Sequence, residues 1–142
     1  MVISGFHAQY RFLSNFYPCQ VEYEGLFYPS VEHAFQAAKT LDIDLRRACA
    51  CYIKEPNEAK KWGRKLKIRK DWEQVKDQVM ADVVWAKFSS HPDLKQKLLD
   101  TGDAELVEGN WWGDTYWGVY DGQGENKLGK ILMEVRTKLR SA

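Results

Sequence analysis

Three polar side chains in the first third of the chain, Glu32, Gln36 and Lys39, have the types and the spacing to act together on one substrate. At about 100° per residue, a helix over residues 30–39 places them within roughly 60° of one another, beside an apolar stripe. A carboxylate can move a proton or stabilise positive charge, and a neutral amine can attack carbon. The spacing therefore makes this segment a candidate for chemistry.

The same residues also have ordinary structural explanations. Ser30 is a candidate N-cap, and a glutamate in the first turn is stabilised by the helix dipole by about 0.3 to 1 kcal/mol when exposed. Lys39 can equally pair with a surface carboxylate. We interpret His33, which points to another face, as structural. Periodicity alone leaves the chemical and the structural interpretation of Glu32 and Lys39 open.

The elements that must position these residues are mostly helices. Residues 21–28 predict a hairpin that turns at Glu24-Gly25, and residues 13–19 predict a loop held by buried rings. Five further helices are expected, over residues 45–53, 57–66, 72–88, 92–101 and 126–139. Pro56 precedes the second, Asp71 is the N-cap candidate of the third, and the fourth begins at Pro92 and stops at Gly102. A candidate strand lies at 104–108. This order predicts one compact, mostly helical α+β domain over residues 1–142, with a small sheet.

Composition narrows the class of protein. The chain has 142 residues, of which 44% are hydrophobic, and a net charge of +1, which provides no overall field for long nucleic acid or anionic membranes. Three cysteines, two of them in Cys49-Ala50-Cys51, do not form a disulfide framework and fit a reducing cytosol. No paired zinc-ligand spacing and no membrane-length apolar run occur in the sequence. We expect a soluble cytoplasmic protein with no metal and no cofactor.

Aromatic residues are concentrated in one polar, glycine-interrupted segment. Five of them lie between positions 111 and 120: Trp111, Trp112, Tyr116, Trp117 and Tyr120. Such residues usually build a core, but in a segment of this kind they more often line a pocket for a flat ligand. The pocket interpretation is the one we favour.

Seven motifs in one order resemble a known family. They are L-S-N-F-Y-P, E-Y-E-G, Y-P-S-V-E-H-A-F-Q-A-A-K, A-K-F, T-G-D-A-E-L-V-E, D-T-Y-W-G and N-K-L-G-K-I-L-M-E-V-R. Together they resemble the NADAR family across nearly the whole chain. The resemblance implies a compact, mostly helical α+β fold and an N-glycosidase. Its substrate would be a small phosphoribosyl or ADP-ribosyl molecule, either an early riboflavin-pathway ribosylaminopyrimidine phosphate or ADP-ribosylated guanine.

The resemblance also implies site residues, motif by motif. The catalytic residues it implies are Glu32 and Lys39, from E-H-x-F-Q-x-x-K, and Asp114, from D-x-x-W-G. The substrate-binding residues it implies are Asn15, Phe16, Gln36, Trp117, Gly118 and Asn126. Taken alone, Asp114 would be a turn-capping residue. Trp111-Trp112-Gly113 departs from the short polar residues that relatives often carry, which leaves substrate choice open.

Breaking a ribosyl N-glycosidic bond requires an acid, a base and a stabiliser of positive charge. In one route Glu32 and Asp114 share these tasks and water attacks the anomeric carbon. In the other, Lys39 attacks that carbon and forms an imine. Asp114 and Trp117 are expected opposite the 30–39 helix. The alternative function is a non-catalytic module that binds ADP-ribose or a nucleotide. We expect no membrane partner; ADP-ribosylated guanine within nucleic acid and the oligomeric state remain open.

Overall fold

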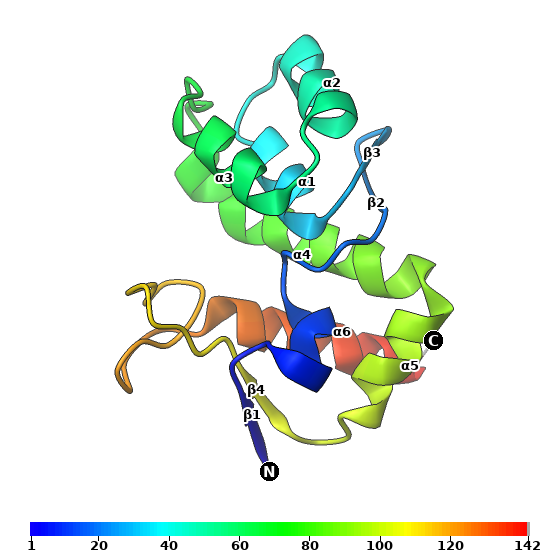
Figure 1. Cartoon of the computed structure of the whole chain (residues 1–142). Coiled ribbons are helices and arrows are strands. Elements are labelled where there is room, and N and C mark those ends of the chain that lie inside the picture. The colour runs from blue at the N-terminus through cyan, green and yellow to red at the C-terminus, as the bar shows by residue number, and fades with distance from the viewer. Residues whose placement is uncertain (142) are drawn as a thin grey trace. The chain divides into compact units, whose positions relative to one another are not determined.

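The structure, a computed structural model, describes residues 1–141, which form two compact units (Figure 1). One unit is Asn15–Lys87; the other combines Met1–Ser14 with the chain from Phe88 onward. Within the described residues, six α-helices and one 3-10 helix accompany four strands of three residues each. The predicted fold class, mostly helical α+β with a small sheet, is confirmed.

The Asn15–Lys87 unit begins with a two-stranded antiparallel hairpin. Strand β2 (Val21–Tyr23) pairs with strand β3 (Leu26–Tyr28), and the turn between them is Glu24-Gly25. Both turn residues have positive φ, 46° for Glu24 and 88° for Gly25. This is the backbone of a tight two-residue hairpin turn, so the predicted hairpin is confirmed.

Helix α1 (Val31–Ala37) follows the hairpin and is the centre of this unit. The Ser30 side chain accepts a hydrogen bond of 3.2 Å from the His33 amide, which confirms the predicted N-cap. The helix ends at Ala37, two residues earlier than predicted. Lys39 therefore lies on the turn after the helix, where its amide donates to the Gln36 carbonyl at 3.1 Å.

All seven residues of α1 are buried, because other elements surround it. Helix α2 (Ile43–Tyr52), helix α3 (Pro56–Arg64) and both hairpin strands contact α1, and α3 makes the most extensive contact (Figure 1). The polar residues of α1 were expected to border the core. They lie inside it.

Helix α4 (Trp72–Ser90) is the longest helix, and it begins where predicted. The Asp71 carbonyl accepts from the first-turn amides, while its carboxylate pairs with Arg69. Trp72 is buried, with its ring centre 5.1 Å from that of Phe35 on α1. Trp85, on the same helix, is 37% exposed.

The other unit pairs the two ends of the chain. Strand β1 (Val2–Ser4) lies parallel to strand β4 (Glu105–Val107), and a 3-10 helix, η1 (Ala8–Leu13), follows β1 (Figure 1). Helix α5 (Pro92–Asp100) and β4 both contact helix α6 (Lys127–Ser141). The sequence predicted α5, β4 and α6 but neither β1 nor η1. Throughout residues 1–141, none of the helices has the length and apolar content that crossing a bilayer requires.

Candidate active site

Glu32 is a buried carboxylate, not an exposed partner of the helix dipole. Its side chain and backbone are 8% exposed, and its Oε2 accepts a 2.6 Å hydrogen bond from Nε2 of Gln36, one turn later. Its amide donates to the Asn15 carbonyl at 3.1 Å, which ties the 13–19 loop to the first turn of α1. A buried carboxylate with a fixed orientation is the type of group that acid–base chemistry uses.

Lys39 follows on the same polar segment, is half-buried and is influenced electrostatically by the Glu32 carboxylate. Burial is the main cause that lowers the pKa of its amine; the positive charges of Arg64 and Lys60 on α3 add to this effect, and Glu32 opposes it. Among residues 1–141, no carboxylate forms an ion pair with Lys39, so the surface-pairing explanation does not describe it. The environment favours a neutral amine more than ordinary solvent does.

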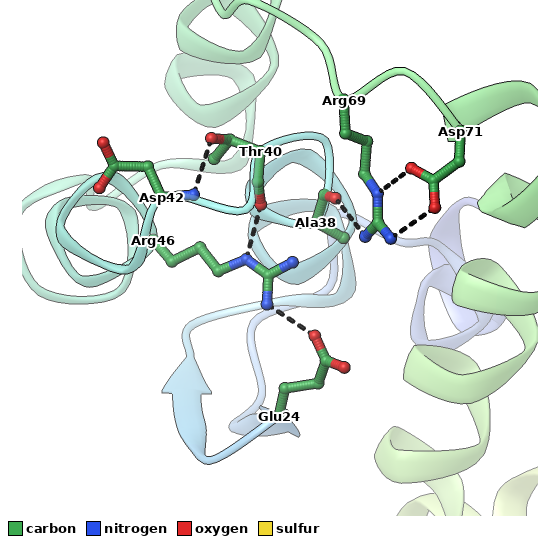
Figure 2. Close-up of polar contacts among 7 residues, drawn as sticks. All are labelled: Glu24, Ala38, Thr40, Asp42, Arg46, Arg69 and Asp71. Carbon is green, nitrogen blue, oxygen red and sulfur yellow. Dashed lines mark hydrogen bonds and ion pairs between the residues drawn. The ribbon is translucent and has the colours of Figure 1, made fainter.

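Arg69 fixes the turn that carries Lys39 from one side (Figure 2). Its backbone amide donates to the Lys39 carbonyl at 2.8 Å, and its NH1 donates to the Ala38 carbonyl at 3.4 Å. The remaining guanidinium nitrogens bind both oxygens of Asp71, at 2.6 and 2.9 Å. Arg69 therefore has a structural role in this turn.

Arg46 of α2 fixes the same turn from the other side (Figure 2). Its Nε donates to the Thr40 carbonyl at 2.8 Å, and its NH1 binds Glu24 in the hairpin turn at 2.7 Å. Its guanidinium also lies 5.6 Å from the centre of the Tyr23 ring. The backbone on both sides of Lys39 is thus held by an arginine, and sequence periodicity did not indicate either contact.

His33 has the structural role that the sequence suggested. Its ring is fully buried between the Ser30 hydroxyl, 2.7 Å from Nδ1, and the Ile53 carbonyl, 2.9 Å from Nε2. The carbonyl can only accept, so Nε2 carries the proton, and burial lowers the pKa of the ring. His33 connects α1 to the end of α2.

The 13–19 loop contributes two predicted binding residues with different environments. The Asn15 carboxamide donates to the Met80 sulfur at 3.6 Å, and its carbonyl supports Glu32. Phe16 is 37% exposed, so this ring is not held in the core as the loop prediction required.

Asp114 lies in the other unit, at the start of a tight turn. Its Oδ1 accepts hydrogen bonds of 3.0 Å from the amides of Tyr116 and Trp117. The Asn110 carboxamide holds both backbone groups of Asp114, accepting from its amide at 3.0 Å and donating to its carbonyl at 2.8 Å. The turn-capping role is therefore real. Sequence reasoning missed Asn110, although an asparagine in a glycine-rich loop is a turn signal.

The environment of Gly118 explains why this position is glycine, whereas Trp117 is only partly enclosed by its neighbours. The Trp117 ring is half-buried and lies edge-on to Tyr116, with 4.8 Å between ring centres. A side chain on Gly118 would overlap the backbone and carboxylate of Glu108, where the Val119 amide donates to the Glu108 carbonyl at 2.9 Å. Glycine is required at position 118 by this close approach of two backbone segments.

Asn126 connects β4 to the start of α6. It adopts a φ of 51° and is 8% exposed. Its Oδ1 accepts from the Glu108 amide at 2.9 Å, and its Nδ2 donates to the Leu106 carbonyl at 3.0 Å. These backbone contacts explain Asn126 without a ligand.

The aromatic segment is not a core. Trp111 is 82% exposed and Trp112 is 51% exposed, and their ring centres are 5.4 Å apart. Tyr120 is also exposed, whereas Tyr116 and Trp117 are half-buried. The structure thus excludes the core interpretation for the tryptophan pair.

The family model of the NADAR domain matches residues 4–140. This chain belongs to the NADAR family. Over 133 residues it is 41% identical to N-glycosidase YbiA of Escherichia coli, a match that covers 92% of this chain and 82% of YbiA. The solved NMR structure of E. coli YbiA superposes with a TM-score of 0.87, covering 99% of this chain and 85% of that one, at 38% identity.

Two further NADAR relatives carry informative names. N-glycosidase Npun_R5314 of Nostoc punctiforme is 38% identical over 141 residues, which cover 93% of this chain and 87% of that protein. Riboflavin biosynthesis protein VVA0006 of Vibrio vulnificus is 38% identical over 136 residues, which cover 91% of this chain but 35% of the longer protein. The family expectation drawn from the motifs is confirmed.

Proposed function

We propose that this NADAR protein hydrolyses a ribosyl N-glycosidic bond in a small phosphoribosyl or ADP-ribosyl substrate. Relatives at 38 and 41% identity are named N-glycosidases, and this chain is an enzyme of that class. The name of the Vibrio relative supports early riboflavin-pathway ribosylaminopyrimidine phosphates as substrates. ADP-ribosylated guanine is the second substrate we propose, from the family motifs.

The observation that carries the proposal is the pair of groups on α1 and the turn after it. Cleavage builds positive charge on the ribose ring and negative charge on the departing nitrogen. We assign the buried Glu32 carboxylate to the anomeric carbon, where it stabilises the ring and accepts a proton from the attacking water. The water oxygen bonds to the carbon, and the leaving nitrogen receives a proton.

Lys39 offers a second route to the same products. A neutral amine can attack the anomeric carbon, displace the nitrogen and, after the sugar ring opens, remain attached as an imine that water hydrolyses. The lowered pKa of Lys39 supports this route because less free energy is needed to remove its proton.

The imine route predicts a trapped adduct. Borohydride added during turnover should reduce the imine to a stable secondary amine on Lys39, detected by mass spectrometry of the digested protein. Lys39→Ala should lose the adduct and at least about 10²-fold in kcat/KM. Lys67→Ala, which removes an exposed lysine of the same unit, is the matched control and should retain both. Full activity of Lys39→Ala would exclude the route and leave direct hydrolysis.

We propose Asp114 as the second carboxylate of the reaction, and Asn15, Phe16 and Trp117 as substrate contacts. For Asp114 the support is its motif, and for the two rings it is their accessible surface. Gly118 and Asn126 have complete structural explanations, so we propose that they act by holding the Asp114 segment.

Product identification tests the proposed function. The protein is incubated with a ribosylaminopyrimidine phosphate, with ADP-ribosylated guanosine and with the unmodified nucleoside, and release of base and sugar is followed by chromatography. We expect release from at least one of the first two and none from the third. Tight binding of both without release, even at protein concentrations above that of the substrate, would support the non-catalytic binding module instead.

A further inference from the structure

The Gln36 side chain has an unusual environment. It is 5% exposed, and its Nε2 donates to Glu32, while its Oε1 is buried and has no hydrogen-bond partner among the described residues. A buried acceptor without a partner is unfavourable, so such an arrangement needs a compensating reason. Turning the carboxamide over would bring its oxygen against the carboxylate oxygens of Glu32, which repel it. The observed orientation is therefore set by Glu32.

The unpartnered oxygen lies against Gly63, in the last turn of helix α3. A Cβ atom at position 63 would overlap Oε1 of Gln36 and would lie 2.8 Å from its Cδ. Gly63 does not have a positive φ, so its backbone conformation does not require glycine. Glycine also has a lower helix propensity than alanine. The contact with Gln36 is what explains glycine at this position.

We infer that Gln36 is a positioning residue that fixes the Glu32 carboxylate, and that Gly63 provides the space in which Gln36 can do so. The assignment rests on the proposed function, because it makes Gln36 act through Glu32 and not through a contact with the substrate. It differs from the substrate-binding role that the family motif implies for Gln36.

Other charges near Glu32 must be separated from the effect of Gln36. Lys39 follows on the same segment and interacts electrostatically with Glu32, as does the Cys49 thiol of α2. Arg64 and Lys60 of α3 act in turn on Lys39. The hairpin that packs on α1 carries Tyr23 and Tyr28 in its strands and Glu24 in its turn. None of these groups is itself substituted in the Gln36 and Gly63 variants, so a change in the Glu32 pKa that follows loss of the Gln36 donor is assigned to the lost hydrogen bond.

A double-mutant cycle tests the contact. Gly63→Ala should lower the melting temperature by several degrees, although alanine is the better helix residue. In a Gln36→Ala background the same substitution should leave the melting temperature unchanged or raise it, because the overlap is gone. Asn57→Ala, at an exposed position of α3, is the control and should have the same effect in both backgrounds. Equal effects of Gly63→Ala in both backgrounds would overturn the contact between Gly63 and Gln36.

The positioning role is tested on Glu32 itself. Gln36→Met keeps the length of the side chain but removes the donor, so the pKa of Glu32 should rise, by roughly one unit or more. An NMR titration of the carboxyl carbon measures this pKa without substrate, and the acid limb of the kcat/KM profile should shift by a similar amount. An unchanged Glu32 pKa would overturn the positioning role.

A second variant and an independent measurement distinguish failure of the positioning role from failure of the proposed function. Gln36→Asn, whose carboxamide is one methylene shorter, should show the same rise if Gln36→Met does not fold. A shifted Glu32 pKa in a protein that cleaves none of the proposed substrates would retain the positioning of the carboxylate and reject the proposed function. Turnover of a proposed substrate, combined with an unshifted Glu32 pKa in the Gln36 variants, would retain the proposed function and reject the positioning role.

Discussion

Replacing Glu32 by glutamine is expected to lower turnover by about 10²- to 10⁴-fold, the range that a positioned proton-transfer group contributes. The substitution keeps the shape of the side chain and removes its charge. Nε2 of Gln36 can still donate to the carbonyl oxygen of the new amide, as it does to Glu32 now at 2.6 Å. The loss should therefore fall on kcat, without a comparable change in the melting temperature.

Glu58→Gln is the matched control for this experiment. Glu58 is the acidic residue in the first turn of α3, as Glu32 is in the first turn of α1, but it is exposed. A helix-dipole role would give both variants the same small loss of stability, well below 1 kcal/mol at an exposed site. If Glu32→Gln retains wild-type kcat/KM, the assignment of Glu32 to the reaction is wrong.

Local signals in the sequence predicted the parts of the fold that short segments determine. The Glu24-Gly25 pair predicted the hairpin turn, because two successive residues with positive φ are what such a turn needs. Ser30 predicted the start of α1. Strand β1, in contrast, has three residues and pairs with β4 about a hundred positions away. A strand that short carries no periodicity, so nothing local could indicate it.

The end of α1 shows how distant residues override a local pattern. The apolar and polar periodicity continues to Lys39, but the helix stops at Ala37. Carbonyl groups that would accept intrahelical bonds are instead bound by Arg46 and Arg69, from segments later in the chain. The turn these arginines hold gives Lys39 its half-buried position, so the feature most relevant to its chemistry was outside the reach of helical spacing.

The candidate site also combines features that the sequence predicted with features that only tertiary packing determines. Residue types and motifs were sufficient to select Glu32 and Lys39, and their burial could only come from the packing of α2, α3 and the hairpin around α1. Gly63 illustrates a tertiary contact that the sequence could not indicate. A glycine inside a predicted helix is a visible anomaly, but its cause is a side chain that lies 27 positions earlier.

Asp114→Asn is expected to reduce kcat/KM by about 10²-fold or more if Asp114 is the second carboxylate, and to leave the turn intact. The turn is retained because an asparagine oxygen can accept from the Tyr116 and Trp117 amides as Oδ1 of Asp114 does, at 3.0 Å each. Asp114→Ala removes the charge and the acceptor together. It should lose the same activity and, in addition, about 1 kcal/mol of stability from the unsatisfied amides.

Comparing the two Asp114 variants distinguishes a chemical role from a turn-capping role, which the structure establishes independently of any reaction. If Asp114 acts only as a cap, Asp114→Asn keeps full activity and Asp114→Ala loses activity only in proportion to unfolded protein. Asp121→Asn provides the control, because it removes a charge from an exposed position of the same segment.

Activity should be measured with substrate both below and above KM. Loss of a carboxylate that acts in the transition state lowers kcat, whereas a distorted turn that weakens binding through Trp117 raises KM. A loss confined to KM would assign the Asp114 segment to substrate binding and leave Glu32 and Lys39 as the reacting groups.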